Sequence, residues 1–153
     1  MLNFLKRLAG GATKQLNSAL YGNKDFLEAA IAASALVAAA DGNIDQAEIT
    51  ETVSLLENHK VLGQAFPKSE ISTVANRMFQ QAKTGSGRQQ LARELDDLKG
   101  KPNGAQMAED VYYIACDVAA QGGTDANEEA TLMKIADRLG VNPDPSWYSL
   151  EHY

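Results

Sequence analysis

The sequence lacks most features that would define a chemistry at once. Its single cysteine, Cys116, excludes an internal disulfide and suits a reducing cytoplasm. No apolar run is long enough to span a bilayer, and no segment alternates with the period of a strand. The P-loop, H-E-x-x-H, G-x-S-x-G and CxxC motifs are all missing. These absences make an enzyme the least supported class of function.

Charge is acidic overall and unevenly distributed. The formal net charge of −6 argues against nucleic acid as the main partner, because binding phosphates needs a concentrated positive surface. Residues 1–24 hold four of the 14 basic residues and no carboxylate: Lys6, Arg7, Lys14 and Lys24. We therefore expect residues 1–22 to form a basic amphipathic leader helix docked on the body. The alternative is peripheral contact with an anionic membrane at its inner face.

Apolar spacing predicts an all-α domain of six to seven helices. Apart from Glu28 and Ser34, residues 26–40 are apolar, which is typical of a helix buried on all sides. Further helices are expected over 46–58, 67–83, 88–99, 104–118 and 127–139. The stretch TGSG, residues 84–87, has the composition of a plain loop. We expect residues 23–143 to form the domain and residues 144–153, with their prolines, an irregular tail.

The stretch AAADGNIDQAE, residues 38–48, has a second copy 80 residues later, VAAQGGTDANE, residues 118–128. Gly42, Asp45 and Glu48 correspond to Gly122, Asp125 and Glu128, whereas Asp41 corresponds to Gln121. Each copy follows an unusually apolar helix and precedes an amphipathic one. Such a duplication predicts two helix–turn–helix units packed about a pseudo-twofold axis.

Capping of the following helix is one interpretation of these acidic turns. With Asp45 as the N-cap, Glu48 stands where it completes a capping box, and Ile44 and Ile49 stand where a hydrophobic staple forms. Asp125 and Glu128 allow the same box in the second turn.

Cation binding is the other interpretation. Asp41 and Asn43 are not required by the capping box, yet they add hard oxygen atoms of the kind that Ca²⁺ and Mg²⁺ prefer. The turn is not an EF-hand, because Gln46 and Thr52 stand where that loop needs glycine and glutamate. The candidate metal ligands are Asp41, Asn43, Asp45, Glu48, Asp125 and Glu128.

Other reactive residue types have ordinary explanations. His59 stands near an expected helix end and His152 in the tail, and neither has an evident catalytic partner nearby, so both are expected to be solvated. Asp117 lies in an apolar helix and is expected to face a polar neighbour or the edge of the bundle. Cys116 is expected to be a small buried apolar residue.

The stretches NKDFLEAAIAASALVAAADGNIDQAE, AAQGGTDANEE and IADRLGVNP resemble the tellurite-resistance TerB proteins. The wider TerB-like group includes the N-terminal domain of the DjlA co-chaperones. The resemblance implies an all-helical fold with internal twofold symmetry, acidic loops proposed to chelate divalent cations, and a role in stress-response or phage-defence systems without enzymatic activity. Gln121 departs from the aspartate usual in the second motif, which argues against two equal sites.

Three functions follow as hypotheses. The first is a cytoplasmic interaction module that responds to Ca²⁺ or Mg²⁺ and binds a protein partner. The second is a metal-free helical adaptor, of a kind that phages or mobile elements encode. The third assigns residues 1–22 to membrane docking.

Overall fold

The computed structural model describes residues 23–121 and 123–143, and these residues form seven α-helices and no strand. The helices are α3 (Lys24–Ala38), α4 (Gln46–Glu57), α5 (Lys60–Ala65), α6 (Lys68–Gln81), α7 (Gly85–Asp96), α8 (Gly104–Ala120) and α9 (Ala126–Leu139). The prediction of an all-α bundle of six to seven helices is confirmed. The leader, Gly122, the tail and His152 lie outside the described residues.

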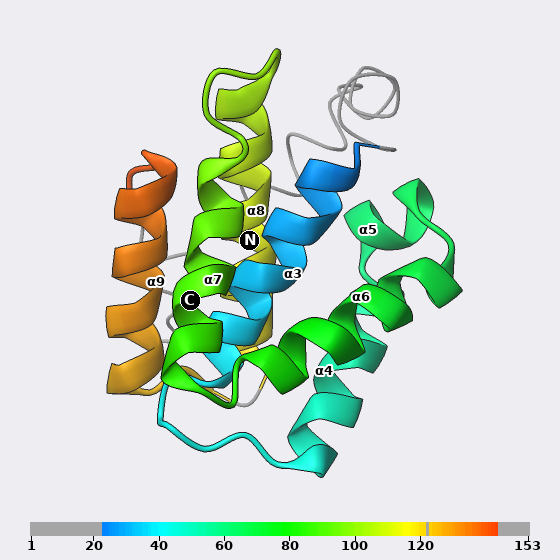
Figure 1. The fold of residues 1–153 in the computed structure, drawn as a ribbon, viewed down its shortest axis with the longest axis vertical. Coiled ribbons are helices and arrows are strands. Elements are labelled where there is room, and N and C mark those ends of the chain that lie inside the picture. Colours follow the sequence, from blue (N-terminus) through cyan, green and yellow to red (C-terminus); the bar gives the residue numbers. More distant parts are fainter. Residues whose placement is uncertain (1–22, 122, 144–153) are drawn as a thin grey trace.

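Helix α3 forms the centre of the bundle, with α6, α7 and α8 packed around it (Figure 1). Most of its side chains are fully buried, including Phe26, Leu27 and Ile31 and a series of alanines. Small alanine side chains let neighbouring helices approach closely. The hydroxyl of Ser34 is also buried and donates to the carbonyl oxygen of Ala30 at 2.8 Å, so it needs no other partner.

The two predicted helix–turn–helix units are the hairpins α3–α4 and α8–α9. Helices α3 and α8 pack side by side, and both acidic turns emerge at the lower end of the molecule in Figure 1. The hairpins differ in how their second helices pack. Helix α9 packs against α8, α7 and α3, whereas α4 packs mainly against α6 and touches α3 only slightly. The surroundings of the two turns are therefore not equivalent.

Two segments correct the predictions. TGSG is not a plain loop, since Gly85–Gly87 form the first turn of α7 and Thr84 caps it by accepting the Gly87 N–H at 3.0 Å. Gly87 is buried, and a Cβ there would lie 1.8 Å from the Gln81 carbonyl oxygen. Glycine is thus needed for close packing against the end of α6. Helix α5 was not predicted, because its six residues are too few to show a helical period.

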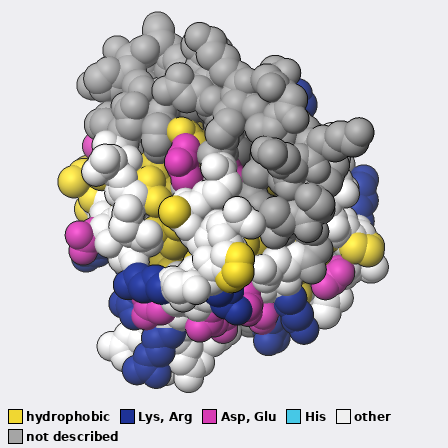
Figure 2. Space-filling view, turned by 90° about the horizontal axis from the view of Figure 1, so that it is seen from above, with side chains coloured by type: hydrophobic (Ala, Val, Ile, Leu, Met, Phe, Trp, Pro, Cys, Tyr) yellow, Lys and Arg dark blue, Asp and Glu magenta, His cyan; other side chains and the backbone are white. Residues whose placement is uncertain are grey.

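Charged side chains on the surface are mixed in sign. Figure 2 shows the end of the molecule that lies at the top of Figure 1, where Lys and Arg side chains alternate with Asp and Glu along one edge. Lys101 pairs with Asp25, and Arg138 pairs with Asp96. Among the described residues, no helix is long and apolar enough to cross a membrane.

Candidate functional site

The first acidic turn is held by two local hydrogen bonds. A carboxylate oxygen of Asp41 accepts the Asn43 N–H at 2.9 Å, and Gly42 between them has a positive φ of 85°. Asp45 caps α4 by accepting the Glu48 N–H at 2.8 Å, as the capping interpretation predicts. Ile49 is fully buried and Ile44 packs partly buried on the same core. The reciprocal hydrogen bond, in which the Asp45 N–H would donate to the Glu48 carboxylate, is not formed.

The second acidic turn forms the complete capping box. Asp125 accepts the Glu128 N–H at 2.8 Å, and the Glu128 carboxylate accepts the Asp125 N–H at 3.1 Å. Helix α9 therefore begins with two of its otherwise unpaired N–H groups satisfied. The duplicated sequence thus yields a full box in the second turn and half of one in the first.

Both turns line one pocket of about 290 Å³. Its walls include carboxylates from both hairpins: Asp41, Glu48, Glu51, Asp125 and Glu128. Gln121 and Thr52 add polar side chains, and Val37 and Val118 add apolar ones. Acidic residues 80 positions apart in the chain are therefore brought to one cavity, as the predicted duplication requires.

Carboxylate charges in this pocket oppose one another. Partial burial raises the pKa of Glu128 above its ordinary value, and the charges of Asp41 and Glu48 from the other turn raise it further. The hydrogen bond from the Asp125 N–H acts in the opposite direction. Loss of hydration also raises the pKa of Glu48, with smaller contributions from the nearby charges of Asp45 and Asp41. The two turns are therefore coupled electrostatically.

The donors in the pocket suit a hard cation, but they are not arranged around one point. Carboxylate and amide oxygens are the ligands that Ca²⁺ and Mg²⁺ prefer. Among residues 23–121 and 123–143, however, no three Asp, Glu, His or Cys side chains gather closely enough to hold an ion. A cation would require side chains in the pocket to move toward one another.

The structure places four of the six candidate ligands at the pocket. Asn43 and Asp45 lie outside its lining. Sequence reasoning missed Glu51, although its position three residues after Glu48 puts it on the same face of α4. Gln121 does line the pocket, so the one departure from the duplicated pattern stands at the site itself.

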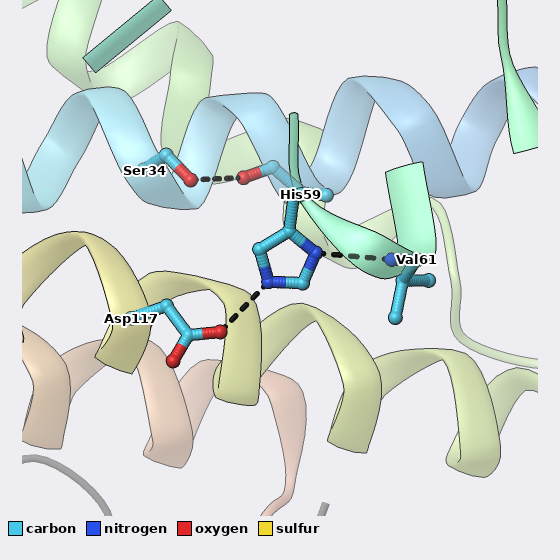
Figure 3. A network of polar contacts seen from close by, with 5 residues as sticks. Ser34, His59, Val61 and Asp117 are labelled. Atoms are coloured by element: carbon cyan, nitrogen blue, oxygen red, sulfur yellow. Dashed lines mark hydrogen bonds and ion pairs between the residues drawn. The ribbon is translucent and has the colours of Figure 1, made fainter. Parts of the chain in front are cut away.

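A second polar cluster corrects the prediction for His59. Its side chain is 8% exposed rather than solvated, and Nε2 lies 2.7 Å from Asp117 Oδ2 (Figure 3). Nδ1 accepts the Val61 N–H at 3.2 Å and so caps α5. Since Nδ1 is an acceptor here, a neutral ring carries its proton on Nε2 and donates it to Asp117.

Two further expectations, for Asp117 and Cys116, are confirmed. Asp117 faces a polar neighbour as expected, and the pair links the segment after α4 to α8. Cys116 is fully buried, as expected.

The fold and the pocket define a class: an all-helical domain in which two related hairpins bring their acidic turns to one cavity. The family model described as Tellurite resistance protein TerB matches residues 27–146. The chain therefore belongs to the TerB family. Neither a curated protein nor a solved structure matches it.

Proposed function

We propose that this TerB-family protein is a non-enzymatic, divalent-cation-responsive interaction module of a stress-response system. The observation that carries the proposal is the shared pocket, which carboxylates from both turns line. Burial and, to a smaller extent, repulsion between carboxylates raise the pKa values of Glu48 and Glu128, so a ligand that neutralises these charges is favoured.

Bridging is the mechanism that this arrangement supports. Without an ion the carboxylates repel and stay apart. A bound Ca²⁺ or Mg²⁺ would draw oxygens of α4 and α9 together, and so change the angle between the two hairpins. The Ca²⁺ ion accepts six to eight oxygens in flexible geometry, which suits donors from two elements better than the strict octahedron of Mg²⁺.

Titration with Ca²⁺ and Mg²⁺ tests the proposal on the full chain. We expect amide chemical shifts to change around residues 41–51 and 123–128 as the ion reaches millimolar concentration. Glu128→Gln keeps an oxygen that can accept the capping hydrogen bond but removes the charge, and should weaken cation binding by at least about tenfold. Glu129→Gln is the matched control, because this neighbouring glutamate is exposed and lies outside the pocket lining. Absence of any shift at millimolar ion contradicts the proposal.

A metal-free adaptor is the second candidate. Asp45 and Asp125 accept capping hydrogen bonds, and Asp41 accepts the Asn43 N–H within its own turn. These carboxylates therefore have structural roles without an ion. An adaptor keeps its partner affinity when Ca²⁺ is removed by chelation, whereas a cation-responsive module loses it. Binding measured with and without chelator separates the two.

Membrane docking rests on residues 1–22, which lie outside the described residues. Co-sedimentation with anionic and neutral liposomes, using the full chain and a variant lacking residues 1–22, tests this role. Specific docking requires binding that depends on both the anionic lipid and the leader.

A further inference from the structure

A groove separate from the acidic pocket lies between α7 and α9. The two helices stand side by side, with the end of α3 as the floor between them (Figure 1). Its volume is about 540 Å³, and it opens to solvent along one side. Apolar side chains make up most of its lining: Leu36, Ala39, Ala40, Ala92, Leu95 and Ile135. The surface therefore has an apolar recess walled by two helices.

The rim of the groove is positive although the whole chain carries a formal charge of −6. Arg88 on α7 and Lys134 on α9 flank it, and neither pairs with a carboxylate within the described part of the chain. Arg88 donates to the Ala82 carbonyl oxygen at 2.9 Å, which holds its charge in place. The carboxylate in the lining is that of Asp137. A partner with apolar and acidic groups complements this surface.

The shape of the groove favours a helix as the occupant. Arg138 makes two hydrogen bonds to Asp96, at 3.1 and 2.9 Å, and so ties the last turns of α7 and α9 together. In the preceding turns of the two helices, the small side chains of Ala39 and Ala40 on the floor of the groove leave space for larger apolar side chains of a partner. An amphipathic helix presents such side chains at intervals of three and four residues. We infer that this groove binds an amphipathic helix of a partner protein with acidic residues beside its apolar face.

The groove and the acidic pocket share two helices. Val37 and Ala38 at the end of α3 line the pocket, whereas Leu36 and the C-cap residue Ala39 line the groove. Helix α9 likewise contributes its first turn to the pocket and its later turns to the groove. A movement of α9 at the pocket would therefore change the width of the groove. The docking inference itself does not depend on cation binding.

Selection from a random 16-residue phage-displayed peptide library on the full chain tests the inference. We expect enrichment of peptides with apolar residues at helical spacing and flanking Asp or Glu. When one of these is synthesised and labelled, its binding should perturb amide shifts at Leu36, Ala92 and Ile135. Ala92→Trp fills the groove and should weaken binding more than about tenfold. Lys134→Glu should weaken it about two- to fivefold, the range for an exposed ion pair.

Arg93→Glu is the matched control, because it makes the same change in charge as Lys134→Glu. Arg93 is exposed on α7 and lies outside the groove. It should leave affinity unchanged, and circular dichroism checks that every variant is folded. The inference is overturned if no peptide class is enriched, if the selected peptides are basic, or if their shifts map elsewhere. It is also overturned if Ala92→Trp folds and binds normally.

The cation proposal and the docking inference fail separately. Peptide binding in the presence of chelator bears only on the groove, and the cation titration without peptide bears only on the pocket. A change in peptide affinity on adding Ca²⁺, lost in Glu128→Gln, would connect them.

Discussion

The acidic turn after α3 and the acidic turn after α8 begin from nearly the same sequence and reach different local structures. The second closes a full capping box, and its helix α9 packs against three others. In the first, Glu48 does not complete the box, and α4 packs mainly against α6. The second turn is therefore held more firmly, by its complete capping box and by the wider packing of α9. If a cation closes the pocket, the first turn is the half that should move.

The largest loss of stability is expected at the corner between α6 and α7, in the segment that connects the two hairpins. Gly87→Ala places a Cβ 1.8 Å from the Gln81 carbonyl oxygen and 2.8 Å from the capping oxygen of Thr84. We expect a loss of about 4 kcal/mol in the free energy of unfolding, near the upper limit for one substitution. Urea denaturation measures it.

Gly85→Ala is the control for this corner. Only the flexible end of Arg88 lies near its added Cβ, at 3.8 Å, so this substitution should be neutral or slightly stabilising. Equal effects of the two substitutions would show that α7 does not approach α6 as described.

The His59–Asp117 pair is a polar connection between the hairpins, since His59 follows α4 and Asp117 lies on α8. His59→Ala should cost about 3 kcal/mol, because it leaves the Asp117 carboxylate, 11% exposed, without its donor. Asp117→Ala should cost less, because it removes the carboxylate itself and so leaves no buried negative charge without its donor.

A double-mutant cycle measures the coupling within this pair. The variant with both alanines should be more stable than the sum of the single losses predicts. Additive losses would contradict the buried pairing.

The two N-caps compare the turns directly. Asp125→Ala disrupts a complete box and should lower the free energy of unfolding by about 1–2 kcal/mol. Asp45→Ala removes only one hydrogen bond from the cap and should cost about 0.5–1 kcal/mol. Each variant is compared with the corresponding asparagine, which keeps the acceptor. A larger loss at Asp45 would reverse the conclusion about which turn is held more firmly.

Much of the fold follows from local patterns in the sequence. The apolar run of α3, the amphipathic spacing of α6 and α9, and the left-handed Gly140 that closes α9 each act within a few residues. What could not be predicted depends on contacts between distant segments. Gly87 has the composition of a loop residue until the end of α6 lies against it. His59 has an ordinary helix-end context until α8 brings Asp117 to its ring.

The candidate site was likewise predicted in part, where local patterns and the repeat were sufficient. The duplication predicted that Asp41, Glu48, Asp125 and Glu128 would share a region, because matching turns of paired hairpins meet. It gave no means of excluding Asn43 and Asp45 from the lining, since side-chain direction at a turn depends on local hydrogen bonds. Its helical spacing from Glu48 could have placed Glu51 at the site, but Glu51 lies outside the repeated stretch.

Charge removal in the pocket should have the smallest effect and the opposite sign. Because the pKa of Glu128 is raised in the folded state, its ionised form opposes folding. The favourable contribution is present below the ordinary glutamate pKa of about 4.3 and is lost as the pH rises through the higher value in the folded protein. Without divalent ions, Glu128→Gln should therefore stabilise the protein at pH 7 by about 0.2–0.5 kcal/mol, the range for a like-charge pair on a helix surface.

The gain from Glu128→Gln should shrink toward pH 4, where the native carboxyl is protonated, and thermal unfolding across this range measures it. Glu48→Gln should behave alike, since its pKa is raised in the same direction. Because glutamine keeps an oxygen for the Asp125 N–H, the capping box does not obscure the comparison at Glu128. Addition of Ca²⁺ should reverse the order of stability, since the wild-type chain alone keeps every carboxylate of the pocket. A gain in stability that does not depend on pH and is unaffected by Ca²⁺ would contradict both the raised pKa of Glu128 and the proposed cation site.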